Sequence, residues 1–159
     1  MSTPPLTRRA LLVSAAVVTA AACTPAPKAP PPPDPLAALA ARARADAALA
    51  TAVGTAVPAL AAPATEVAKA RTEHAVVLQK EVDRERPPVS SSGSAAPTTS
   101  ATAPPTAPAD PAAAKKALVD GLTAAEKEAS GVVATVPRYR AGMVGSVAAG
   151  CASLREVLA

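Results

Sequence analysis

Apolar residues recur at steps of three and four along two stretches in the first half of the chain, and prolines bound both stretches. Such spacing places the apolar side chains on one side of an α-helix. In the first stretch these positions are Leu36, Leu39, Ala43, Ala47, Ala50, Val53 and Val57. In the second, which begins between Pro58 and Pro63, they are Leu60, Ala64, Val67, Ala75, Leu78 and Val82. Because the connection is short, residues 35–86 are predicted to form an antiparallel helical hairpin.

The same pattern returns in residues 111–159, which are predicted to form a second hairpin. The third helix carries its apolar residues at Leu118, Leu122, Ala125, Ala129, Val132 and Val136. After Pro137 a fourth helix carries them at Val144, Val147, Cys151, Leu154 and Leu158. Both hairpins open on an Asp-Pro pair, Asp34-Pro35 and Asp110-Pro111. The carboxylate can cap free backbone N–H groups, and proline suits the first helical position.

Between the hairpins, residues 87–110 consist almost entirely of Pro, Ser, Thr, Ala and Gly. Such a composition cannot bury apolar surface, so a disordered crossover linker is predicted, either bare or O-glycosylated. About 25 flexible residues span roughly 25–30 Å, which is close to the length of the helices. The predicted fold is therefore all-α, with two helical hairpins forming a small four-helix bundle. One long crossover makes this the ferritin-like topology.

The chain begins with a different pattern. Arg8 and Arg9, with no acidic residue beside them, precede a mainly apolar run from Ala10 to Ala22. A positive segment followed by a short apolar run is typical of a signal peptide. A helix of these 13 residues would span only about 20 Å, against a hydrocarbon core of about 30 Å. Residues 1–22 are therefore predicted to be an export signal and not a stable transmembrane helix.

The end of this run, Ala20-Ala21-Ala22-Cys23, resembles the bacterial lipobox, in which small residues precede a cysteine that receives diacylglycerol. Most such boxes begin with leucine, and Ala20 departs from that. Cys23 is predicted to carry lipid, which would hold the protein at the extracytoplasmic face of the cell membrane. Cleavage by ordinary signal peptidase is the alternative and would leave the protein secreted. Residues 7–12, TRRALL, also resemble a twin-arginine export motif, and this route and the general one both stay open.

Residues 23–34 join the predicted lipid site to the first helix through a proline-rich tether, TPAPKAPPPPD. A polyproline conformation rises about 3.1 Å per residue, so the tether would hold the bundle some tens of Å from the membrane. A ligand for a proline-binding module is the alternative interpretation of the same residues.

Composition adds a limit on stability and on partners. The chain is rich in alanine and has 19 prolines, and its single aromatic residue is Tyr139. Alanine favours helices, but each buried methyl contributes only about 0.8 kcal/mol, so the core is expected to be thin. The net charge of +4 falls to about +2 once residues 1–22, with two arginines and no acids, are removed. That mild charge, without interleaved aromatic residues, does not indicate a nucleic-acid partner. The membrane, through the lipid, and an unknown protein are the predicted partners.

Three segments are similar to alanine-rich, ferritin-like lipoproteins and twin-arginine-exported proteins of high-GC Gram-positive bacteria. They are PRYRAGMVGSVAA at residues 137–149 with Cys151 following, DPL at residues 34–36, and TEHA at residues 72–75. The resemblance covers roughly residues 34–86 and 111–159. It implies a helical bundle and carries no activity with it.

The chemistry of such bundles is a di-metal site, built from two Glu-x-x-His motifs and a glutamate from each remaining helix. The only histidine is His74, and Arg71 stands three residues before it. A di-iron site is therefore not expected. His74 with Glu73 or Glu81 could bind a lone metal ion, but a paired or solvent-edge histidine is the preferred interpretation.

The other candidate groups are also interpreted as structural. Cys151 lies on an apolar stripe, where a thiol behaves as a small hydrophobe, and nothing in the sequence places His74, the only candidate for an activating histidine, beside it. A charged run is expected to form the solvated face of the second helix: Glu66, Lys69, Glu73, Lys80, Glu81, Asp83, Arg84 and Glu85.

No Gly-rich phosphate loop, nucleophile elbow or zinc-ligand spacing occurs in the sequence. No catalytic, cofactor-binding or metal-binding residue is therefore predicted, no cofactor is expected, and the chain is not expected to be an enzyme. The favoured function is a lipid-anchored structural or protein-interaction role. A ferritin-like bundle that binds a metal or small ligand between its hairpins is the alternative.

Overall fold

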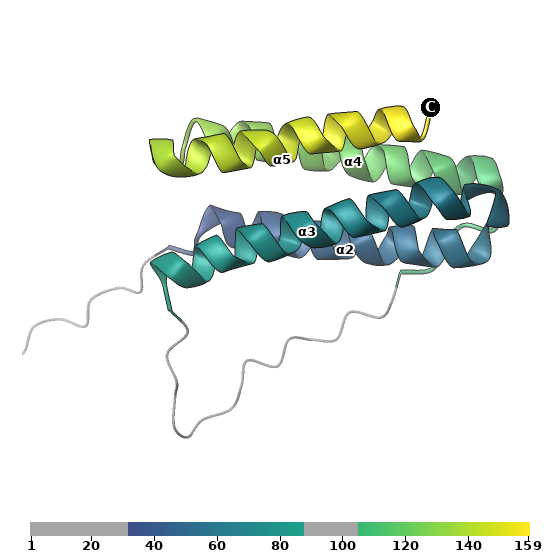
Figure 1. Ribbon diagram of the computed structural model, residues 1–159, viewed down its shortest axis with the longest axis horizontal. Helices are drawn as coiled ribbons and strands as arrows, with labels where there is room; N and C mark the ends of the chain where they lie inside the picture. Colours follow the sequence, from purple (N-terminus) through teal and green to yellow (C-terminus); the bar gives the residue numbers. More distant parts are fainter. Residues whose placement is uncertain (1–31, 88–104) are drawn as a thin grey trace, which may run out of the picture. The chain divides into compact units, whose positions relative to one another are not determined.

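The computed structural model describes residues 32–87 and 105–159, and within these residues all regular structure is helical, with no strand (Figure 1). The first hairpin consists of α2 (Pro35–Ala56), the short 3-10 helix η2 (Pro58–Leu60) and α3 (Ala61–Glu85). The second consists of α4 (Pro111–Val133) and α5 (Arg138–Val157). The predicted all-α fold of two helical hairpins is confirmed.

The Asp-Pro pairs begin the helices as predicted. Asp34 accepts a hydrogen bond from the backbone N–H of Leu36 at 2.9 Å, and Asp110 accepts one from the N–H of Ala113 at 2.7 Å. In each case proline occupies the first helical position, where no N–H is needed. At the other end of α2, the helix stops before Pro58, and the 3-10 turn reverses the chain into α3.

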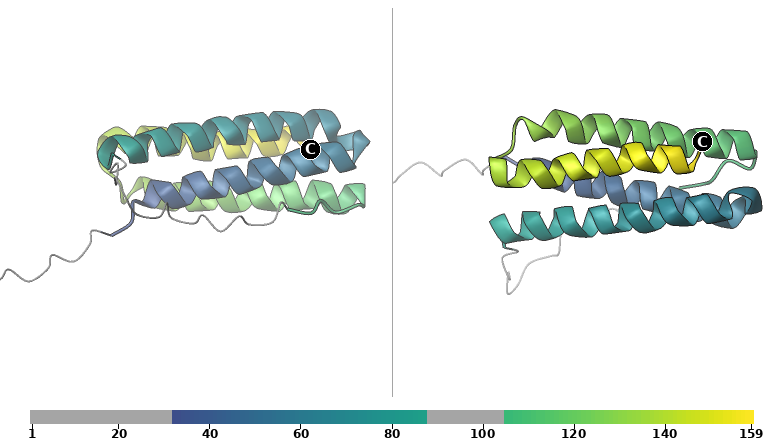
Figure 2. Two further views of the ribbon diagram at one scale, coloured as in Figure 1. Left: turned by 90° about the horizontal axis from the view of Figure 1, so that it is seen from below. Right: turned by 45° about the horizontal axis from the view of Figure 1, so that its top comes forward.

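The directions of the helices are those of a four-helix bundle with one long crossover. In Figure 1, α2 and α3 run in opposite directions, as do α4 and α5, whereas α3 and α4 run in the same direction. The end of α3 and the beginning of α4 therefore lie at opposite ends of the bundle, as a single long crossover requires. Figure 2 shows from two further directions that the hairpins lie side by side.

Several predicted features lie outside the described residues. They are the export signal with Arg8 and Arg9, the lipid site at Cys23, most of the tether, and residues 88–104 of the crossover. Residues 105–110 of the predicted linker are described: they form no helix, and Ala107 packs against the core. None of the described helices is both long enough and apolar enough to cross a membrane.

The core consists of two apolar clusters, and each takes residues from all four α-helices. One cluster contains Ala50, Val53, Val57, Ala64, Val67, Ala114, Leu118, Leu122, Ala125, Cys151, Leu154 and Leu158. The other contains Leu36, Leu39, Ala40, Leu78, Ala129, Val144, Val147 and Ala148. Every predicted apolar position of α2 and α5 is buried, which confirms both stripes. Between the two clusters along α2 and α3 lie two buried charged residues, Asp46 and Arg71.

Candidate functional site

Four charged side chains are buried within the described part of this alanine-rich bundle: Asp34, Asp46, Arg71 and Arg140. Arg71 is the largest of the fully buried side chains, with only 1% of its surface exposed. A buried charge is costly unless a partner of opposite charge and hydrogen bonds compensate it. The partners of these four residues define two clusters, one near the middle of the bundle and one at an end.

In the middle of the bundle, Arg71 on α3 and Asp46 on α2 form a buried ion pair. Two guanidinium nitrogens of Arg71, Nη2 and Nε, donate to Asp46 Oδ2 at 2.8 Å and 3.2 Å. The other carboxylate oxygen, Oδ1, accepts from Nε of Arg42 at 3.1 Å. The Asp46 carboxylate is therefore held between two arginines, and its charge is compensated on both oxygens.

Arg42 extends the pairing from the first hairpin to the second. Its Nη1 donates to Oε1 of Glu128 at 3.1 Å, and its Nη2 donates to the backbone carbonyl of Gly121 at 3.3 Å. Both acceptors belong to α4. The same arginine thus connects the buried carboxylate to the neighbouring hairpin.

The remaining nitrogen of Arg71, Nη1, lies 3.1 Å from Nδ1 of His74 and 3.2 Å from Sγ of Cys151. The structure therefore brings together a histidine and a cysteine that the sequence pattern gave no reason to place together. Cys151 is buried in the apolar core, as predicted, and Arg71 gives it a positively charged neighbour. We call Arg42, Asp46, Arg71, His74 and Cys151 the central cluster.

Electrostatics keep the thiol and the imidazole of the central cluster uncharged. Burial raises the pKa of Cys151 above its ordinary 9.0, an effect that Arg71 opposes and Asp46 strengthens. The thiol therefore stays protonated at neutral pH and is not an activated nucleophile. Burial, followed by the charge of Arg71, lowers the pKa of His74, while Glu73 opposes that shift.

The second group, which we call the end cluster, consists of Asp34, Glu81, Arg84 and Arg140. Arg140 Nη2 on α5 donates to Asp34 Oδ2 at 2.8 Å, and its Nε lies 3.4 Å from Glu81 Oε1 on α3. Arg84 contacts the same oxygen of Glu81 at 2.7 Å. Burial alone would raise the pKa of Asp34, but the hydrogen bonds from Arg140 and the Leu36 N–H outweigh it and lower the pKa. The first turn of α5 is thereby tied to the start of α2 and to the last turns of α3.

Glu81 corrects the prediction of a wholly solvated charged face on α3. Only 12% of its side chain is exposed, because it turns toward Arg140. The other residues of the run are exposed, as predicted: Glu66, Lys69, Glu73, Lys80, Asp83, Arg84 and Glu85.

The sequence contains one signal for the buried charges, namely arginines at positions of the apolar stripes. Arg71 stands four residues from both Val67 and Ala75, so it falls on the apolar stripe of its helix. Arg140 likewise stands four residues before Val144. A charged residue at a stripe position predicts either a break in the stripe or a buried ion pair.

In di-metal proteins of this topology, side chains from facing helices hold the metals in the core. Here a guanidinium group, a cation that cannot coordinate a metal, occupies the core between α2, α3 and α5. Within residues 32–87 and 105–159, no group of three or more His, Cys, Asp or Glu side chains is placed to hold a metal ion.

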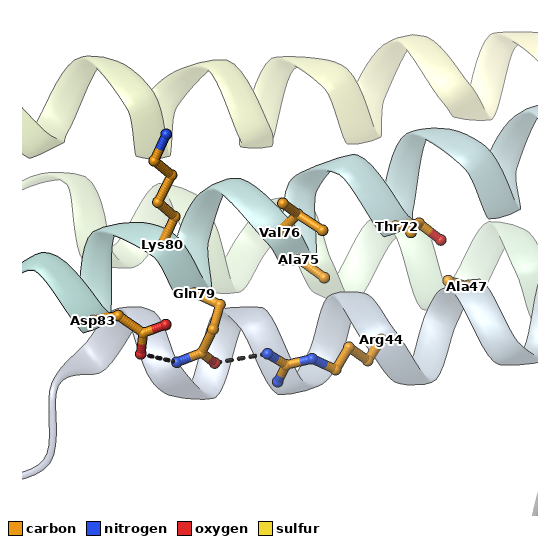
Figure 3. Close-up of a pocket in the computed structure, with 8 residues that line it drawn as sticks. All are labelled: Arg44, Ala47, Thr72, Ala75, Val76, Gln79, Lys80 and Asp83. Atoms are coloured by element: carbon orange, nitrogen blue, oxygen red, sulfur yellow. Dashed lines mark hydrogen bonds between the residues drawn. The ribbon is translucent and has the colours of Figure 1, made fainter. Parts of the chain in front are cut away.

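The surface carries an open groove of about 530 Å³ on the first hairpin, between α2 and α3 (Figure 3). Its lining residues are Arg44, Ala47, Thr72, Ala75, Val76, Gln79, Lys80 and Asp83. Along one side, Arg44 donates to the Gln79 side chain at 2.6 Å, and Gln79 donates to Asp83 at 2.8 Å (Figure 3). A smaller groove of about 260 Å³ lies between α3 and α5, where Glu66, Lys69 and Glu73 face Leu154 and Val157.

Comparison of the chain with known protein families, with curated proteins and with solved structures finds no match. The resemblance to alanine-rich, ferritin-like lipoproteins therefore stays a prediction.

The contact between His74 and α5 makes a glycine favourable at position 150. A Cβ atom at Gly150 would lie 2.9 Å from both Cε1 and Nε2 of His74, which is too close for a carbon atom, so the ring would have to shift. We expect Gly150→Ala to lower the free energy of unfolding by about 1–3 kcal/mol, although alanine is the better helix former. Urea unfolding followed by circular dichroism measures the change.

Gly142 on the same helix is the matched control, because its added Cβ would meet no atom within 4 Å. Gly142→Ala should stabilise the bundle by up to about 1 kcal/mol. Combining Gly150→Ala with His74→Ala should remove most of the cost of the glycine substitution. Equal effects of the two glycine substitutions would contradict the close contact.

Proposed function

We propose that this chain is an exported protein, anchored through lipid on Cys23 to the extracytoplasmic face of the cell membrane, with a structural or protein-interaction role. The observation that carries the proposal is the order of segments along the chain. Arg8 and Arg9 precede an apolar run that ends at Cys23, a proline-rich tether follows, and a helical bundle begins at Pro35. A bundle held away from a membrane by such a tether is placed to meet partners near that membrane.

The chemistry of the bundle interior supports a role without catalysis. Asp46 and Arg71 neutralise each other inside the core, and the thiol of Cys151 stays protonated. These groups hold helices together and offer no charge to a substrate. The outer surface is then the part of the bundle that a partner would contact.

The groove between α2 and α3 supports a protein partner over a small molecule. Pockets for small molecules are mostly apolar and aromatic and enclose the ligand. This groove is open, has an alanine floor at Ala47 and Ala75, and carries long polar side chains such as Arg44 and Lys80 at its sides. Such a surface suits the side chains of another protein.

Anchoring can be tested through Cys23. We expect Cys23→Ala to move the protein from the membrane fraction to the soluble exported fraction, or to leave it unprocessed, because no other predicted element holds it at the membrane. Fractionation followed by immunoblotting measures the distribution, and mass spectrometry of the wild-type protein should find acyl chains on the residue.

Cys151→Ala is the matched control, since it removes the other cysteine, which is buried in the core. It should leave the protein in the membrane fraction. Wild-type protein that carries no acyl chain at Cys23 would contradict the proposed anchor and leave secretion as the outcome.

A further inference from the structure

The imidazole of His74 is confined between two groups that leave it little freedom. On one side, its Nδ1 lies 3.1 Å from Nη1 of Arg71. On another, its Cε1 and Nε2 would lie 2.9 Å from a Cβ atom added at Gly150 on α5, so a larger residue there would displace the ring. Arg71 itself is held by two hydrogen bonds to Asp46 and cannot easily withdraw.

Hydrogen-bond chemistry determines the protonation state of this ring. A guanidinium group has five N–H donors and no acceptor. Nδ1 of His74 must therefore accept the hydrogen bond from Arg71, which leaves the imidazole neutral with its proton on Nε2. Protonation of Nδ1 would place two N–H groups face to face and set a second positive charge beside a buried guanidinium.

We propose that His74 is a pH-sensitive latch between α3 and α5. In its neutral form the ring accepts the hydrogen bond from Arg71 and allows α5 to pack at Gly150. In its protonated form it is repelled by Arg71 and must leave its place, which loosens α5 from α3 around Gly150 and Cys151.

The charged and titratable groups around the ring and the neighbouring thiol come from all four α-helices: Arg71 and Glu73 on α3, Asp46 on α2, Cys151 and Arg155 on α5, and Glu126 on α4. Glu73 favours the protonated ring, but it is exposed and its effect is screened by water. The charge of Asp46 is shared between two arginines, and Glu126 is paired with Arg155. Arg71 is therefore the charge that acts most directly on the ring.

The direction of the pH dependence follows from these contacts. The pKa of His74 in the folded protein lies below its ordinary 6.5, mainly because of burial and then because of Arg71. Below about pH 6.5 the unfolded chain therefore binds more protons than the folded chain, and acid favours unfolding. Stability should be constant with respect to this group above about pH 7.5 and should fall as the pH drops through the folded pKa.

His74 is the only histidine in the chain, so its imidazole signals in an NMR titration of the processed full chain are unambiguous. We expect them to titrate below the ordinary value. The thermal midpoint of the wild-type protein should fall by several degrees between about pH 7.5 and about pH 5. In His74→Gln, whose amide oxygen accepts from Arg71 at any pH, that fall should be largely absent.

Amide hydrogen exchange at about pH 5 locates the change, because wild type and His74→Gln can be compared at the same pH. Faster exchange in the wild type should be concentrated in α3 and α5 around the contact of His74 with Gly150. An imidazole that titrates at or above its ordinary value, or equal pH dependence in the two proteins, would overturn the latch. Faster exchange spread evenly over the four α-helices would also overturn it, and the titration alone decides the matter if His74→Gln does not fold.

Discussion

Replacing Asp46 with alanine is expected to lower the free energy of unfolding by about 3–5 kcal/mol, because the guanidinium of Arg71 would stay in the core without its carboxylate. Arg71 is almost wholly inaccessible to water, and Asp46 accepts hydrogen bonds from two of its nitrogens. Folded domains are stable by only about 5–15 kcal/mol, and a thin alanine core favours the lower end of that range. Asp46→Ala should therefore leave much of the protein unfolded at physiological temperature, as circular dichroism during urea and thermal unfolding can measure.

Three further variants separate the effect of losing the charge of Asp46 from the effect of losing its side-chain volume. Asp46→Asn keeps the shape and one acceptor oxygen, so its cost should be smaller. The double variant Asp46→Leu, Arg71→Met replaces the pair with apolar side chains and should recover much of the lost stability. Asp120→Ala removes an exposed partner of Lys116 and should change little. The buried-pair interpretation fails if Asp46→Ala costs no more than Asp120→Ala.

Replacing Arg140 with alanine is expected to lower the free energy of unfolding by a similar amount, about 3 kcal/mol or more. Here the group removed is the cation, and carboxylates are left behind. Asp34 would then be a buried carboxylate without its arginine, and the mostly buried Glu81 would keep only Arg84. The first turn of α5 would also lose its connection to α2 and α3. Urea unfolding at neutral pH measures the loss.

The sign of the pH dependence distinguishes this mechanism from simple loss of packing. In the wild type the pKa of Asp34 is lowered from 3.8, so its stabilising effect is present above that pH and is lost as the pH falls through the folded pKa. Without Arg140, burial should raise the pKa of Asp34, and protonation would then relieve the cost of its buried charge. The difference in the free energy of unfolding between Arg140→Ala and the wild type should therefore become smaller as the pH falls toward about 4. A difference that stays constant with pH would indicate lost packing alone. Arg84→Ala, an exposed arginine on the same glutamate, should have little effect.

The helices and their buried faces could be predicted from the sequence because both depend on local chemistry. Proline positions, the Asp-Pro caps and the spacing of apolar residues act within one helix at a time. The apolar positions of α2 and α5 are all buried, whereas Val132 and Val136, near the end of α4, are only partly buried. Periodicity thus predicts which side of a helix is buried more reliably than how deeply its last turn is covered.

The central cluster and the end cluster could not be predicted in the same way, because their ion pairs depend on how the helices align with one another. Periodicity places Arg71 on an apolar stripe but does not say which residue of α2 lies opposite. It likewise gives no reason for Glu81 to turn inward, since that depends on Arg140 arriving from α5. The position of Cys151 was predicted, but its contact with Arg71 required the alignment of α5 with α3.

The long crossover also implies an order of folding events. Asp46 and Arg71 are separated by 25 positions within one hairpin, whereas Asp34 and Arg140 are separated by 106 and belong to different hairpins. Contacts between distant residues form late, because a large loop must close before they stabilise anything. The first hairpin can therefore form its own ion pair while it folds, and α5 completes the burial of that pair when the hairpins dock. Asp34 and Arg140 stay hydrated until the hairpins dock. The desolvation cost of the end cluster is therefore part of the free-energy change of docking, and docking is the folding step whose free energy depends most on either residue.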